Sequence, residues 1–118
     1  MAAVALNTFK TVRTVVTPNN VGIYTAPIGV ASIVLFAQAV NLDPENVRFV
    51  TLIHARPINP DGGAIDFQII NQGPVIPNDA LNLLNGRLVL ETNDELRVSG
   101  NTTGDVKVVI SILETAKS

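Results

Sequence analysis

Apolar and polar residues alternate along several short stretches of the chain. In the range 64–70, Ile65, Phe67 and Ile69 are separated by Asp66 and Gln68. An alternation with a period of two residues predicts a β-strand with one buried face and one wet face. The range 105–115 alternates in the same way, although its second face is only partly polar.

The stretch 30–40 is apolar on both of its predicted faces, and 105–115 comes close to this. In 30–40 the odd positions from 31 hold only alanine, isoleucine and leucine, and the even positions from 32 hold Ser32, Val34, Phe36, Gln38 and Val40. A small sandwich buries only the inner face of each sheet, so such strands need a second cover. We expect a neighbouring subunit to supply it. The alternative is an outer face of uneven polarity, since much of any protein surface is apolar.

Pro, Gly, Asn and Asp divide the chain into short segments rich in Val, Ile, Thr and Phe. This spacing is typical of a β-sandwich or barrel rather than of alternating strands and helices. We therefore predict an all-β fold, a single antiparallel β-sandwich of about eight strands that is jelly-roll-like. Residues 17–118 form the sandwich domain, and residues 1–16 form either an extended N-terminal arm or the first strand.

The dipeptide Asn85-Gly86 separates the segments 80–84 and 87–91. Asn-Gly is a strong hairpin signal, because both central residues of a type I′ turn need a positive φ. We expect 87–90 to return antiparallel to 80–84. A short helix over 79–84, capped by Asn78, is the alternative for the first of these segments.

Composition narrows the classes of partner. The 118 residues are 47% hydrophobic and 15% charged, with no cysteine and a net charge of -2, whereas an average domain has about 25% charged residues. The eight cationic residues are scattered along the chain, so we expect neither nucleic acid nor a membrane surface as a partner. The start of the chain lacks the pattern of a signal peptide, and the longest apolar run is too short to cross a bilayer.

Candidate chemistry is sparse. The single histidine is His54, and no serine lies in a nucleophile elbow. The carboxylates Glu91, Asp94 and Glu95 are close in sequence but lie in a turn, where Asp94 is expected to stabilise the bend. Oxygen ligands for calcium could come from Asp43, Glu45 and Asn46, or from Asn101 and Asp105, but neither stretch has the spacing of an EF-hand. We predict no enzyme, and no catalytic, cofactor-binding or metal-binding residues.

An ordered set of segments resembles a family of small β-sandwich virion proteins from tailed bacteriophages. The matching pieces lie at 23–27, 32–41, 47–54, 74–81, 88–91, 94–98 and 106–115. The resemblance implies a capsid cement (decoration) protein, most often a homotrimer on the major capsid protein, located on the capsid surface of the virion. A tail, neck or baseplate component is the alternative within the same family. The resemblance carries over no catalytic residue and no cofactor. The segment 56–63 is longer in this chain than the family pattern leads us to expect.

On this hypothesis we predict oligomer and partner contacts at seven apolar residues, and expect residues 2–16 to tether the subunit to the shell. The predicted contacts are Phe9, Val12, Val34, Phe36, Val40, Val109 and Leu113. An alternative from another class is a receptor- or carbohydrate-binding module on a fibre. Its site would use Tyr24, His54 and the loop Pro57 to Gly63.

Overall fold

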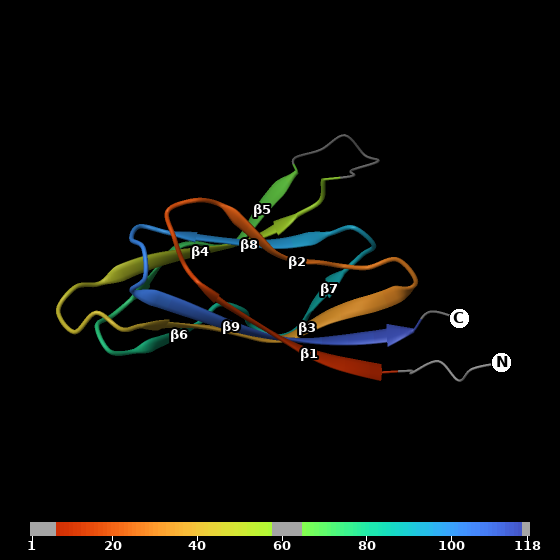
Figure 1. Ribbon diagram of the computed structural model, residues 1–118, viewed down its shortest axis with the longest axis horizontal. Helices are drawn as coiled ribbons and strands as arrows, with labels where there is room; N and C mark the ends of the chain where they lie inside the picture. The colour runs from red at the N-terminus through yellow and green to blue at the C-terminus, as the bar shows by residue number, and fades with distance from the viewer. Residues whose placement is uncertain (1–6, 58–64, 117–118) are drawn as a thin grey trace.

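The computed structural model describes residues 7–57 and 65–116. In these residues the chain forms nine strands and no helix, arranged as two antiparallel sheets that pack face to face (Figure 1). The strands are β1 (Asn7–Val15), β2 (Val21–Thr25), β3 (Val30–Asn41), β4 (Arg48–Ala55), β5 (Asp66–Val75), β6 (Ala80–Asn82), β7 (Leu88–Leu90), β8 (Glu95–Gly100) and β9 (Val106–Ala116).

The larger sheet has the order β1-β9-β3, with β6 and β7 both paired to the far side of β3, and the smaller sheet has the order β2-β8-β4-β5. β6 and β7 pair with successive parts of the same edge of β3 and therefore act as one interrupted edge strand. Counted in this way, each of the two sheets has four strands. This arrangement is a jelly roll. The predicted all-β sandwich is therefore confirmed.

Residues 7–15 pair with β9 along their whole length, from Asn7 opposite Thr115 to Val15 opposite Lys107. Of the two alternatives for the start of the chain, the described part is thus the first strand. The remainder of the predicted tether, 2–6, lies outside the described residues.

The predicted hairpin at Asn85-Gly86 is wrong. Gly86 does have a positive φ of 87°, but β6 and β7 each pair antiparallel with β3, so they run in the same direction. Between β6 and β7 the chain turns towards the core. There Leu83 is buried, and its backbone amide donates a hydrogen bond to the carbonyl of Ala37. The twelve-residue edge of β3 supplies the hydrogen bonds that a hairpin would otherwise make. The alternative helix over 79–84 is also absent, since 80–82 is a strand.

A bulge in β3 changes which of its side chains face the core. Val34 pairs with Ile112, but the next residue in register with β9 is Phe36, opposite Ser111, so Leu35 is an extra residue. A strand that inserts one residue reverses its alternation from that point on. Before the bulge Ser32 and Val34 face inward, whereas after it Ala37 and Ala39 do.

The core lies between the two sheets. It is built from alternate residues of the central strands, and its largest fully buried side chains are Leu52, Leu90, Leu96, Ile110 and Ile112. The predicted strand over 105–115 is confirmed as β9, with its even-numbered residues buried from Val106 to Ile112. On the other face Lys107 is exposed and the remaining residues are half-buried.

Candidate functional site

The outer face of the larger sheet carries a line of apolar side chains across four strands. Residues paired across an antiparallel sheet point to the same face, and Phe9 pairs with Leu113, Leu113 with Ile33, and Ile33 with Val89. Phe9 is 74% exposed and Val89 is 59% exposed. We call these four residues the apolar row. It crosses the end of the sandwich at which the described chain both begins and ends (Figure 1).

Beyond the apolar row the same face mixes apolar side chains with polar and cationic ones. Phe36, 41% exposed, and Ser111 form the next pair, and Arg13 and Lys107 follow on β1 and β9. Arg13 and Lys107 border a shallow hollow with Thr14, Val15, Val108 and Val109. Among the described residues, the outward positions paired in this sheet include no Asp or Glu. The outer face therefore combines apolar area with uncompensated positive charge.

The structure brings together five of the seven predicted contact residues on this outer face. They are Phe9, Phe36, Val40, Val109 and Leu113. Their role as contacts stays a prediction.

The other two residues face inward. Val34 is fully buried in the core, so the prediction that it forms a subunit contact is wrong; the bulge at Leu35 separates it from Phe36. Val12 packs against the core from β1. The sequence did not predict that Ile33 and Val89 belong to this outer face. The bulge in β3 places Ile33 on the same face as Phe36, and the position of Val89 depends on the pairing of β7 with β3.

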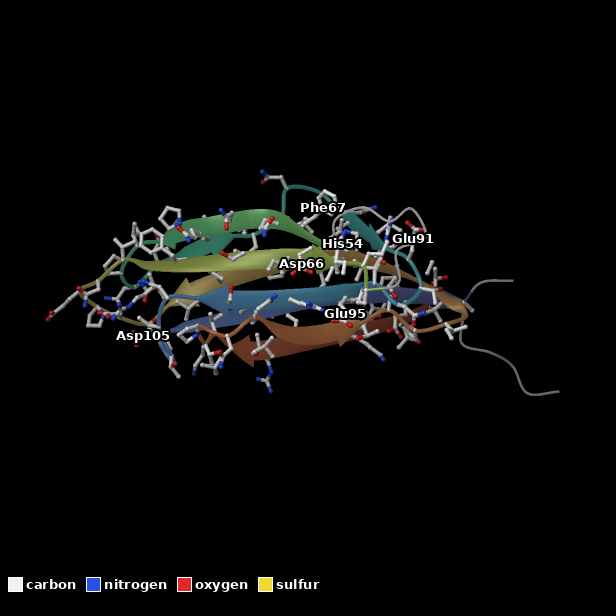
Figure 2. All side chains as sticks on the ribbon, turned by 90° about the horizontal axis from the view of Figure 1, so that it is seen from above. His54, Asp66, Phe67, Glu91, Glu95 and Asp105 are labelled. Atoms are coloured by element: carbon white, nitrogen blue, oxygen red, sulfur yellow. The ribbon has the colours of Figure 1, made fainter. Side chains whose placement is uncertain are left out.

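A polar cluster closes one end of the smaller sheet, around the turn before β8. Asp94 is 1% exposed, and its carboxylate accepts hydrogen bonds from His54 Nε2 at 2.8 Å, Arg56 Nε at 2.9 Å and the amide of Glu91 at 2.9 Å. Arg56 also pairs with the exposed Glu91 at 2.7 Å. Figure 2 shows His54 and Glu91 at this end of the sheet.

Burial alone would raise the pKa of Asp94, but the hydrogen bonds from Arg56 and His54 outweigh it and lower the pKa to about 2. Both carboxylate oxygens accept hydrogen bonds within the fold, and the carboxyl of Glu95 pairs with Arg97 instead. The hydrogen bonds from His54 and Arg56 to Asp94 link the end of β4 to the turn before β8. The expected role of Asp94 in stabilising the bend is confirmed by its bond to the Glu91 amide.

A second polar cluster bridges the two sheets. The Tyr24 hydroxyl, on β2, donates to Glu114 on β9 and lies 2.9 Å from the hydroxyl of Ser32 on β3. Burial and the Glu114 carboxylate raise the pKa of Tyr24 to about 12. Lys10 pairs with the other Glu114 oxygen at 3.4 Å. The cluster thus ties the edge strands β1 and β2 to the sandwich.

These two clusters bear on the alternative carbohydrate site. Tyr24 and His54 both pair with Leu96 on β8, in one row across the smaller sheet. The Tyr24 hydroxyl and His54 Nε2 are each occupied by a partner inside the fold. The third element of that site, residues 57–63, lies outside the described residues apart from Pro57.

Within the described ranges, no group of three or more His, Asp or Glu side chains is placed to hold a metal ion. The same residues include no helix that is long and apolar enough to span a membrane.

Comparison with known proteins gives similarity of fold only. No family model matches the sequence, and no curated protein matches it. A solved structure described as "Bacillus endospore appendages form a novel family of disulfide-linked pili" is similar to this chain, with a TM-score of 0.55 and 10% sequence identity. The similarity covers 100% of this chain and 98% of that chain.

Proposed function

We propose that this chain is a structural subunit of a multi-copy assembly, and specifically a phage virion protein that binds the major capsid protein as a cement. The observation that carries the proposal is the outer face of the larger sheet. There an apolar row with Phe9 at 74% exposure shares its face with Arg13 and Lys107, and the paired outward positions of the described sheet hold no carboxylate. An exposed apolar patch of this kind marks an interaction surface.

The low charge of the chain supports the same proposal. Only 15% of its residues are charged, and four of the cations, Lys10, Arg48, Arg56 and Arg97, pair with carboxylates of their own chain. Few charged side chains remain to hydrate the surface, and this favours a surface that neighbouring subunits cover in the assembly. Many weak contacts then add up over a repetitive shell.

A tail, neck or baseplate component is the second candidate. It is favoured by the similarity of fold to a protein of Bacillus endospore appendages, which form disulfide-linked pili. This chain has no cysteine, so its contacts in a tubular assembly would be non-covalent.

Copy number and rebinding test the proposal. Quantitative mass spectrometry of purified particles that contain this gene product is expected to find it in amounts comparable to the major capsid protein, and purified protein is expected to rebind saturably to particles that lack it. A few copies per particle would favour the tail candidate instead. Absence from the particle, or no rebinding, would overturn the cement function.

A further inference from the structure

A small hollow lies on the outer face of the smaller sheet, at the end of β4 away from His54. Thr51 on β4 pairs with Ser99 on β8, and both side chains face away from the core, since their neighbours Val50 and Val98 belong to it. The hollow has a volume of about 200 Å³ and is lined by Phe49, Thr51, Gln72, Ser99, Gly100 and Asn101. Figure 2 looks down onto this sheet.

The lining offers hydrogen-bonding groups that the fold does not use. Asn101 Oδ1 accepts a hydrogen bond from the amide of Phe49 at 3.0 Å, which holds the side chain in place and leaves its Nδ2 as a donor. The Ser99 hydroxyl and the side-chain amide of Gln72 form no hydrogen bond with another residue of 7–57 or 65–116. None of the six lining residues is charged.

A bulge in β5 brings Gln72 to the hollow. Between Gly73 and Ile70, β5 has one residue more than β4, and Gln72 takes a φ of 50°, a left-handed conformation that is uncommon outside glycine. The amide of Gln72 donates to Thr51 Oγ1 at 2.9 Å and so holds this conformation. Bulges commonly redirect a side chain beside a functional site, and backbone strain of this kind also clusters at such sites.

We propose that this hollow binds one ring of a neutral pyranose sugar. A sugar hydroxyl both donates and accepts hydrogen bonds, as do the Ser99 hydroxyl and the Gln72 amide group. The C–H groups on one face of a pyranose suit an aromatic wall, and Phe49, 39% exposed, supplies it. A drug-sized ligand needs about 300–1,000 Å³, so the smaller volume here favours a single ring.

The inference goes beyond the proposed function and does not depend on it. The hollow lies on the sheet opposite to the apolar row, so a chain that bound a shell through its larger sheet would turn the hollow outwards. One ring in an open hollow is expected to bind with a dissociation constant in the millimolar range. Repetition over many copies would strengthen attachment to a glycan-covered surface.

An NMR titration of the isotope-labelled full chain tests the site. The probes are methyl glucoside, methyl galactoside and N-acetylglucosamine. At least one of them is expected to shift the backbone amide signals of Gln72, Gly100 and Asn101 saturably, at millimolar concentrations. Glycerol, which has hydroxyls but no ring, should produce no saturable shift.

Three variants separate the side chains of the hollow from the fold. Gln72→Gly removes the side chain while glycine accepts the positive φ, so it should fold at least as stably as the parent and bind sugar about tenfold more weakly. Phe49→Ala should weaken binding to a similar extent. Phe67→Ala, at an exposed phenylalanine of β5 paired with His54, is the matched control and should leave binding unchanged.

The sugar site would be overturned by the absence of a saturable shift with all three sugars. A Gln72→Gly variant that binds as tightly as the parent would overturn it too. Shifts centred on Tyr24 and His54 would instead place the sugar at the alternative carbohydrate site, at the other end of the sheet. None of these outcomes bears on copy number or rebinding, through which the proposed function fails separately.

Discussion

Replacing Asp94 with alanine is expected to lower the free energy of unfolding by about 3 kcal/mol, because it leaves Arg56, His54 and the Glu91 amide without their shared acceptor. For a chain of this size the midpoint of thermal unfolding should fall by roughly 10 °C. Asp94→Asn keeps the shape and one acceptor oxygen, so it should cost less than alanine. Thermal and urea unfolding at neutral pH measure both effects.

Glu91→Gln is the matched control for Asp94. Glu91 also binds Arg56 but is 71% exposed, and an exposed ion pair contributes less than about 1 kcal/mol. If Glu91→Gln costs as much as Asp94→Ala, the buried carboxylate is not what holds this end of the sandwich together.

The loss of stability at acidic pH is a second measure of what the Asp94 carboxylate contributes. The folded pKa of Asp94 is about 2, below its ordinary value of 3.8, so the folded state binds fewer protons than the unfolded state in this range. The stability that Asp94 contributes is therefore complete above about pH 4 and is lost as the pH falls towards 2. The Asp94→Ala variant should lack this part of the acid dependence, and an unchanged acid profile would contradict the assignment.

Asn41→Leu is expected to destabilise the protein by about 3 kcal/mol, since it removes three hydrogen bonds from a fully buried side chain. The Asn41 amide donates to the carbonyls of Asn46 and Val75, both at 2.9 Å, and its oxygen accepts from the amide of Asp43. One side chain thus joins the end of β3, the loop after it and the end of β5 in the other sheet. Chemical denaturation measures the loss.

Two further variants sharpen this prediction. Asn41→Asp has almost the same shape but turns a negative charge towards two carbonyl oxygens, so it should be at least as harmful as leucine. The exposed Asn46 serves as the control: its contact with Asn41 is made by the backbone carbonyl, and Asn46→Ala should change stability by less than about 0.5 kcal/mol. Equal losses at both positions would contradict the role assigned to the Asn41 amide.

The sequence pattern was sufficient for the class of fold, because alternation within a strand is local. The strand over 105–115 follows directly from its period of two, and β9 buries alternate residues from Val106 to Ile112. The same logic failed in β3, where the bulge at Leu35 reverses the alternation. A bulge depends on the register of the neighbouring strand, which the residues of β3 alone do not encode.

The pairing between segments that are distant in the sequence could not be predicted from the sequence either. Asn85-Gly86 has the local chemistry of a hairpin, yet β7 pairs with β3 because that edge was open along its length. The Asp94 cluster joins residues separated by about forty positions. The apolar row likewise exists only once four strands are placed side by side, so composition indicated an interaction surface without locating it.

A density map of the assembled particle, detailed enough to trace strands, tests the central claim most directly. We predict that the outer face of the larger sheet is covered by another protein chain, with Phe9 and Val89 buried in the contact. A map in which the chain is present and this face lies open to solvent would contradict the account.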